Sequence, residues 1–170
     1  FLHNTTVSLN WAWGILHQNY VTNWKHEIGI KPKLRTYVKF KSLYETESYV
    51  ASGMSFKFRS VLARLRSGIL PLEIEIGRYH GLPVHERLCK ICRTNTVENE
   101  SHFLFECVAY STQREIYFNK IINVEAGFLS MDLDSKFHVI MSKSCVVETA
   151  KYVYNIYTTR QQILYNDIDV

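Results

Sequence analysis

Long apolar runs are absent from this 170-residue sequence, and it contains no internal repeat and no low-complexity linker. A helix that spans a bilayer needs about 18 or more consecutive apolar residues, so neither a membrane-spanning segment nor a membrane partner is expected. Nor does the pattern of the sequence lead us to expect a signal peptide. Hydrophobic residues at 46% and charged residues at 21% instead indicate an ordered, globular protein rather than a disordered tail.

The chain also lacks an initiator methionine, since it begins at Phe1, so we expect it to be a fragment of something longer. Its length suits one domain or a small pair and is sufficient to bury a core.

Cysteine is scarce, with four in all, but three of them lie with one histidine inside nineteen residues. Cys89, Cys92, His102 and Cys107 follow the spacing C-x2-C-x9-H-x4-C. Three thiolates and one imidazole are a standard ligand set of a closed structural zinc site, so the pattern predicts one bound Zn²⁺. Two alternatives are a pair of disulfides in a secreted protein and ordinary buried cysteines beside a surface histidine.

The spacing of the last two ligands constrains the backbone. An α-helix advances about 100° per residue, which leaves side chains five residues apart about 140° apart around the axis. A regular helix through His102 and Cys107 therefore cannot direct both at one ion. We expect His102 in extended or turn backbone and Cys107 at the start of the following helix, where the helix N-terminus favours a thiolate. His80 and His85 are less favoured substitutes, because the four residues already complete a tetrahedral shell.

Charge is unevenly distributed along the chain. The net charge is +4, but residues 25–66 hold ten basic and three acidic side chains, whereas the rest holds ten basic and thirteen acidic ones. This asymmetry is typical of a polyanion-binding surface. The candidate nucleic-acid contacts are Lys31, Lys33, Arg35, Lys39, Lys41, Arg59, Arg64, Arg66, Arg87, Lys90 and Arg93. The solvated surface of an ordinary helix is the competing interpretation of the basic residues of 56–67.

The periodicity of the apolar residues predicts a mainly α fold. Helices are expected at about Leu9–Ile28, Thr36–Ala51, Phe56–Ser67, Tyr110–Val124, Asp132–Ser142 and Ser144–Tyr165. Leu72–Ile76 alternates apolar and acidic residues and is expected to be a short strand. We divide the chain into a basic helical segment (1–68), a zinc-knuckle region with its following helix (69–124) and a C-terminal helical pair (125–170), packed as one unit.

Two apolar stripes are expected to be buried. Leu9, Trp13, Leu16, Tyr20 and Trp24 recur at helical spacing, for which core packing is favoured over base stacking. A second stripe, with its basic residues on the other faces, consists of Phe58, Val61, Leu62, Leu65 and Ile69.

Three further segments, together with the ligand spacing, carry a family resemblance. They are Leu62–Arg78, Arg87–Cys92, and Glu98–Cys107 followed by Tyr110 and Arg114. They resemble the zinc-binding region downstream of reverse transcriptase in LINE-type, non-LTR retrotransposon polyproteins, and Lys31–Tyr37 looks like the segment that often precedes it. The resemblance covers about residues 31–118, and its nine-residue gap before His102 is slightly longer than the commonest spacing.

The resemblance implies a non-catalytic helical region around a CCHC knuckle that helps to hold an RNA template or DNA target. It implies that Cys89, Cys92, His102 and Cys107 are the metal ligands. The polymerase itself is not expected here, because the sequence has no aromatic-x-Asp-Asp motif. The pairs Asp132/Asp134 and Asp167/Asp169 lack the surroundings of a two-metal site and are interpreted as a helix N-terminal charge pair and a tail.

Two functions therefore follow from the sequence. The first is a non-catalytic, intracellular module, nuclear or cytoplasmic, that binds RNA or DNA and contains a structural zinc. The second is a structural or protein-interaction domain that docks on the flanking reverse transcriptase, or a domesticated remnant of one. Catalytic zinc is disfavoured, because four protein ligands leave no open coordination position for water.

Overall fold

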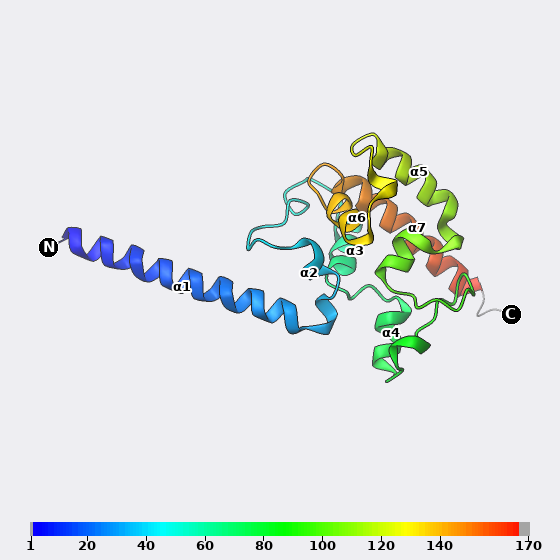
Figure 1. Ribbon diagram of the computed structural model, residues 1–170, viewed down its shortest axis with the longest axis horizontal. Coiled ribbons are helices and arrows are strands. Elements are labelled where there is room, and N and C mark those ends of the chain that lie inside the picture. Colours follow the sequence, from blue (N-terminus) through cyan, green and yellow to red (C-terminus); the bar gives the residue numbers. More distant parts are fainter. Residues whose placement is uncertain (1, 167–170) are drawn as a thin grey trace.

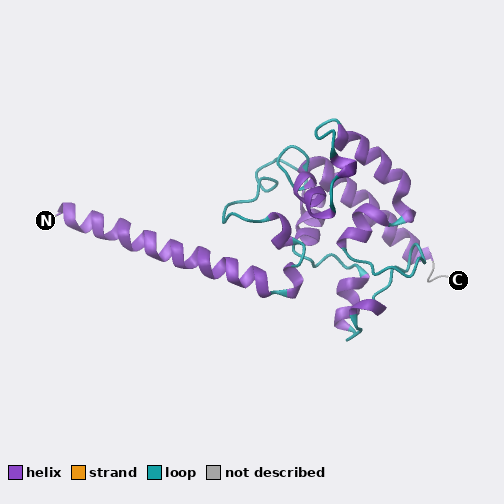
Figure 2. Cartoon of the chain, viewed as in Figure 1, coloured by secondary structure: helices purple, strands orange, loops and turns teal. Residues whose placement is uncertain are grey.

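The computed structural model describes residues 2–166, which form helices and connecting turns (Figures 1 and 2). The α-helices are α1 (Leu2–Ile30), α2 (Tyr37–Phe40), α3 (Phe56–Arg66), α4 (Glu73–Tyr79), α5 (Ser111–Ile122), α6 (Leu133–Ile140) and α7 (Val146–Asn166). Shorter helical turns lie at Pro32–Leu34, Val84–Glu86, His102–Glu106, Val108–Tyr110 and Phe128–Ser130. Residues 2–166 include no strand, and their single isolated β-bridge pairs Leu88 with Val97. The mainly α prediction is therefore confirmed.

Helix α7 is the centre of the folded body, where it packs against both α3 and α5. Its fully buried Val153 and Ile156 are three residues apart and therefore share the inward face, and α3 contributes the fully buried Leu62 and Leu65 to the same core. The exposed Ile69, by contrast, does not continue the α3 stripe. The predicted helices corresponding to α3, α5, α6 and α7 are confirmed.

Helix α1 extends away from this body (Figure 1). The prediction that its aromatic stripe packs in the core is wrong: Trp13 is 71% exposed, and Leu16 and Tyr20 are also exposed. The stripe meets the loop that carries Tyr44, whose ring centroid lies 5.2 Å from that of Tyr20 and 5.4 Å from that of Trp24. Helical spacing identifies residues that share a face, but it does not determine whether another element covers that face.

The predicted helix over Thr36–Ala51 is also wrong, because regular structure ends with α2 at Phe40. Lys41 adopts extended backbone and is buried, and its Nζ lies 3.2 Å from a carboxylate oxygen of Glu47. The same ammonium donates to the carbonyl oxygen of Glu45 at 2.8 Å. These contacts hold residues 41–47 in a loop after α2, in place of the continuous helix that was predicted.

The predicted strand Leu72–Ile76 is a helix, α4. Alternating apolar and acidic residues predict a strand when the acidic side chains face water. Here Glu73 and Glu75 are both buried. Glu73 lies 3.3 Å from Nη2 of Arg160, and Arg78 donates to Glu75. The acidic residues are thus paired internally, and the alternation does not describe a solvent-exposed face.

Asp132 caps α6 by accepting a hydrogen bond from the backbone N–H of Ser135 at 2.9 Å, which confirms its predicted place at a helix N-terminus. Asp167 and Asp169 lie outside the described residues. Within the described part of the chain, no helix is both long and apolar enough to cross a membrane.

Candidate metal centre

The four predicted ligands lie together in the folded protein. Their sulfur and nitrogen atoms are all within 4.8 Å of one another, and each of the four residues except the half-buried Cys92 is buried. None of the chain's cysteines forms a disulfide. The Cys₃His group can therefore hold a metal ion, and the alternatives of two disulfides or of a surface histidine are not found.

The first two ligands are carried by a tight loop. The bridge between Leu88 and Val97 closes this loop, and the N–H of Cys89 donates to the carbonyl oxygen of Thr96 at 2.9 Å. Arg93 and Asn95 both adopt positive φ angles of 55°, which reverse the chain between the two ends. Asparagine tolerates this left-handed conformation better than most residues, so the sequence favours the turn locally.

The second pair of ligands is joined by a π-type turn over His102–Glu106. The N–H of Cys107 donates to the carbonyl oxygen of His102 at 2.8 Å, a bond that spans five residues instead of the four of an α-helix. This wider turn brings residues five apart to the same side. The expectation of extended or turn backbone at His102 is wrong, because the residue begins a short π-helix; the premise that a regular α-helix cannot direct both side chains at one ion stands. Cys107 does directly precede the helical turn Val108–Tyr110, as expected.

The separations between ligand atoms fit a tetrahedral ion. Bonds of about 2.3 Å to sulfur and 2.0–2.1 Å to nitrogen place neighbouring ligand atoms about 3.5–3.8 Å apart. The Sγ atoms of Cys89 and Cys107 are 4.0 Å apart, and Sγ of Cys92 is 3.4 Å from Nε2 of His102. Small movements would bring all four atoms to bonding distance.

The electrostatics of the cluster also suit a cation. The hydrogen bond from the Cys107 thiol to the Cys89 sulfur lowers the pKa of Cys89 to about 3 and raises that of Cys107 above its ordinary value. Hydrogen bonding to the Cys89 sulfur raises the pKa of His102 to about 9. The cluster therefore favours a thiolate at Cys89 and a proton on Cys107 and on His102. A divalent ion that binds here must displace those protons.

The imidazole of His102 presents Nε2 to the cluster, while its Nδ1 is buried without a hydrogen-bond partner among the described residues. The nearest charged group to Nδ1 is the carboxylate of Glu106, at 3.7 Å. Metal-bound histidines usually donate the N–H of the other ring nitrogen to a carboxylate or carbonyl, which fixes the tautomer. Glu106 is placed to accept that bond after a small rotation.

The metal loop, residues 88–107 with the four candidate ligands, is attached to the hydrophobic core by the residues that directly follow His102. Phe103 and Leu104 are fully buried, and the ring of Phe103 meets that of Tyr110 edge-on with centroids 5.5 Å apart. The hydroxyl of Tyr152 on α7 donates to the carbonyl oxygen of Leu104 at 2.7 Å. The conformation of the ligand-bearing turn and the packing of the body are therefore linked.

Comparison with known proteins does not add a relative: no protein-family model, no curated protein and no solved structure matches this chain. The interpretation of the site therefore depends on its own residues and geometry.

Most of the predicted nucleic-acid contacts are engaged within the protein. Seven of the eleven form ion pairs with carboxylates, namely Lys31, Lys33, Arg35, Lys39, Lys41, Arg66 and Lys90. Arg87 donates to the carbonyl oxygens of Ile74 and Leu82. Sequence composition alone cannot reveal these pairings, because the partners of Arg35 and Lys39 are Glu100 and Asp134, far along the chain.

Arg59, Arg64 and Arg93 form no ion pair with any residue in the described range 2–166. On α3, Arg59 and Arg64 are accompanied by Lys57, which was not among the candidate contacts chosen from the sequence. Lys57 and Arg64 are seven residues apart and therefore share one flank of the helix, where they lie over the rings of Tyr154 and Tyr157 of α7 at 5.1 Å and 5.9 Å. This flank combines two cations with two tyrosines.

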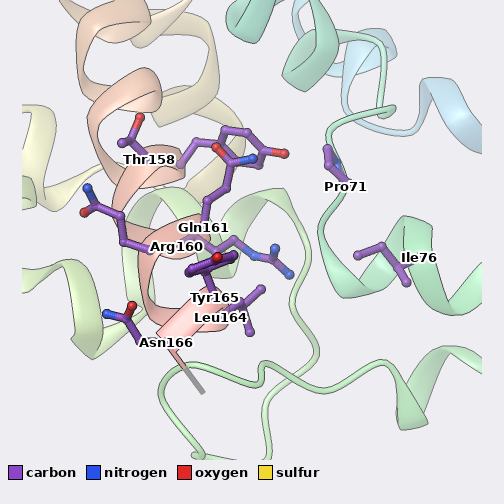
Figure 3. A pocket seen from close by; sticks show the side chains of 10 residues that line it. Pro71, Ile76, Thr158, Arg160, Gln161, Leu164, Tyr165 and Asn166 are labelled. Atoms are coloured by element: carbon purple, nitrogen blue, oxygen red, sulfur yellow. The ribbon is translucent and has the colours of Figure 1, made fainter. Parts of the chain in front are cut away.

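A hollow of about 890 Å³ opens beside the last turns of α7, opposite Pro71 and Ile76 (Figure 3). Its lining is formed by Pro71, Ile76, Tyr157, Thr158, Arg160, Gln161, Gln162, Leu164, Tyr165 and Asn166. Among residues 2–166, the lining includes no acidic side chain, histidine or cysteine, the groups that most often act as general base or nucleophile.

Two further residues near the metal loop were not selected from the sequence. Glu98 and Arg160 are both buried and form a bidentate ion pair, with Nε to Oε1 at 2.8 Å and Nη2 to Oε2 at 2.7 Å. A lone arginine in the last helix gives no local sign of this role. Its partner lies 62 residues away, so only the folded chain identifies the pair.

Proposed function

We propose that this chain is a non-catalytic nucleic-acid-binding module of a longer intracellular polypeptide, built around a structural zinc ion. The observation that carries the proposal is the convergence of Cys89, Cys92, His102 and Cys107 on one small volume. A tetrahedral set rich in thiolates favours Zn²⁺ over the oxygen-preferring Mg²⁺ and Ca²⁺. Four protein ligands close the coordination shell, which supports a structural role in the manner of a CCHC knuckle.

When bound, the ion would be held by all four side chains and would offset the charge of three thiolates. The remaining roles belong to the protein itself. The π-type turn orients His102 and Cys107, and the bridge between Leu88 and Val97 closes the loop that carries Cys89 and Cys92. The thiols must stay reduced to act as ligands, which supports a reducing, intracellular location.

The flank of α3 that carries Lys57 and Arg64 is the proposed contact with nucleic acid. Both cations are free of carboxylate partners among the described residues and lie beside Tyr154 and Tyr157. Cations that contact phosphates release counterions, so such a surface binds RNA or DNA with strong salt dependence. The resemblance of residues 31–118 to the zinc-binding region of non-LTR retrotransposon polyproteins supports a place beside a reverse transcriptase.

The test is filter binding of the zinc-loaded protein to a mixed pool of RNA and single-stranded DNA at low and high salt. We expect retention that falls steeply with salt and that is lost in the double variant Lys57→Glu/Arg64→Glu. The control is Lys136→Glu/Lys143→Glu, which makes the same change in net charge on and just after α6. Salt-insensitive retention, or equal loss in both double variants, would refute a binding site on α3.

A second candidate function is a protein-interaction domain, and the exposed stripe of α1 favours it. Trp13, Leu16 and Tyr20 present large apolar surfaces on a helix that extends from the body (Figure 1). In the proposed setting this helix docks on the flanking reverse transcriptase domain. Under this alternative Lys57→Glu/Arg64→Glu leaves docking intact, whereas Trp13→Ala/Leu16→Ala abolishes it in a pull-down with that domain.

A further inference from the structure

The ion pair between Arg160 and Glu98 is the most deeply buried charged contact near the metal loop. Glu98 is fully buried and Arg160 is 3% exposed. The second carboxylate oxygen of Glu98 also accepts a hydrogen bond from the N–H of Glu73 at 2.8 Å, where α4 begins. A buried carboxylate without such partners would be strongly unfavourable, so the guanidinium of Arg160 is the main compensating contact of Glu98 in this position.

Glu98 lies directly behind the ligand Cys89. Its Oε1 atom is 3.9 Å from Sγ of Cys89, and the same oxygen accepts the hydrogen bond from Nε of Arg160. Three thiolates, a neutral imidazole and a divalent cation together have a net charge of about −1. A further carboxylate at this distance repels the thiolates unless a cation balances it, and the guanidinium of Arg160 is that cation.

We propose that Arg160 is a positioning residue of the metal centre: from α7 it holds Glu98 behind Cys89 and balances the charge of that carboxylate, so that a divalent metal ion binds more tightly. The inference rests on the metal centre of the proposed function but not on its nucleic-acid surface.

The backbone around Glu98 explains how the contact orients the ligand. The N–H of Glu98 donates to the carbonyl oxygen of Arg87 at 2.9 Å, and its own carbonyl oxygen accepts from the N–H of Ile74 at 3.1 Å. Glu98 is thus fixed to both the strand-like start of the metal loop and α4. A shift of the Glu98 side chain would move its backbone N–H, which donates to Arg87, two residues before Cys89.

Charge around the pair is nearly balanced by two further groups. Glu73 lies 3.3 Å from Nη2 of Arg160 and 3.1 Å from Nζ of Lys90, the residue after the first ligand. Lys90 is 61% exposed and therefore screened by water, whereas Arg160 is buried. The loss of Arg160 leaves two buried carboxylates without their shared partner.

The experiment measures binding of Co²⁺, whose absorption bands report tetrahedral thiolate coordination, by titration of the metal-free full chain. For Arg160→Met we expect the Co²⁺ affinity to fall about tenfold or more, the usual size of an outer-shell effect. Arg160→Met/Glu98→Gln should recover most of that loss, because no unpaired charge remains. The control Arg78→Met removes another arginine–glutamate pair, with Glu75, and should bind Co²⁺ as the unaltered protein does.

Arg160→Lys provides a second route if the methionine variant does not fold. It keeps the charge but loses the bidentate geometry, and we expect an affinity between those of the unaltered protein and Arg160→Met. A fall in melting temperature with unchanged Co²⁺ affinity and spectrum in both variants would overturn the proposal and leave Arg160 a purely structural residue. Failure of the unaltered protein to bind Co²⁺ would overturn the metal centre itself. Tight Co²⁺ binding without nucleic-acid retention would overturn only the proposed function.

Discussion

Removal of one ligand by Cys107→Ala, compared with Cys145→Ala, tests whether the metal centre supports the fold. Both side chains are buried, at 0% and 1% exposure, and neither forms a disulfide. Each substitution removes one buried sulfur atom, which costs about 1 kcal/mol through lost packing. Only Cys107 belongs to the cluster, so any additional effect of its loss measures the contribution of the metal.

The size of that additional effect follows from the turn that Cys107 closes. If the turn over His102–Glu106 is released, the fully buried Phe103 and Leu104 lose their environment. Burial of each such side chain contributes about 1.5–3 kcal/mol, or roughly 3–6 kcal/mol together. For a chain of this length 1 kcal/mol shifts the Tm by about 2–4 °C, so Cys145→Ala should lower it by about 2–4 °C and Cys107→Ala by roughly 6–24 °C more than that.

The assay is thermal unfolding followed by near-UV circular dichroism, with zinc content measured by elemental analysis. We expect one zinc per chain for the unaltered protein and for Cys145→Ala, and none for Cys107→Ala. A strong chelator should lower the Tm of the unaltered protein to that of Cys107→Ala, since the energy of metal binding in such sites is largely folding energy. Equal Tm values for the two variants, or no response to the chelator, would refute the structural role of the ion.

Three other substitutions test contacts away from the metal. Glu47→Ala removes the carboxylate that pairs with the buried Arg66, so chemical denaturation should show a loss of about 3–5 kcal/mol; a loss under about 1 kcal/mol would contradict the pairing. Hydrogen bonds from Arg78 lower the pKa of Glu75 from its ordinary 4.5, so this carboxylate stabilises the fold above that pH and less as the pH falls through its folded pKa. The stability deficit of Glu75→Gln in urea should therefore shrink between about pH 7 and about pH 3, and a constant deficit would argue against the ion pair. Trp13→Ala should leave the Tm within about 1 °C, because Trp13 is 71% exposed; a larger drop in a thermal melt would mean that α1 packs on the body.

The grouping of Cys89, Cys92, His102 and Cys107 was predictable from the sequence, because four potential metal-binding side chains at a restricted spacing are an unusual local pattern. The backbone between the last two was not. The argument that an α-helix cannot direct both His102 and Cys107 at one ion is sound, but the solution is a wider turn with a five-residue hydrogen bond. The sequence of 102–106 contains no glycine or proline that would mark this turn, and its geometry follows from burial of Phe103 and Leu104.

For the basic segment, residues 25–66, the sequence predicted the charge but not the partners of that charge. Residue counts correctly identified an excess of positive charge over 25–66, yet charge counts do not identify partners. Arg35 pairs with Glu100 and Lys39 with Asp134, so much of this charge balances carboxylates from later segments. On α3, by contrast, Lys57 and Arg64 have no carboxylate partner among residues 2–166 and lie over tyrosine rings of α7.

The sequence by itself determined the helical class, most helix positions in the second half of the chain and the four ligands, since these depend on local spacing along one segment. The tertiary structure decided that the stripe of α1 is exposed, that residues 73–79 form a helix and that Glu98 meets Arg160 behind Cys89. The physical reason is common to all three. Periodicity defines which side chains share a face, but burial and charge pairing depend on which distant segment packs against that face.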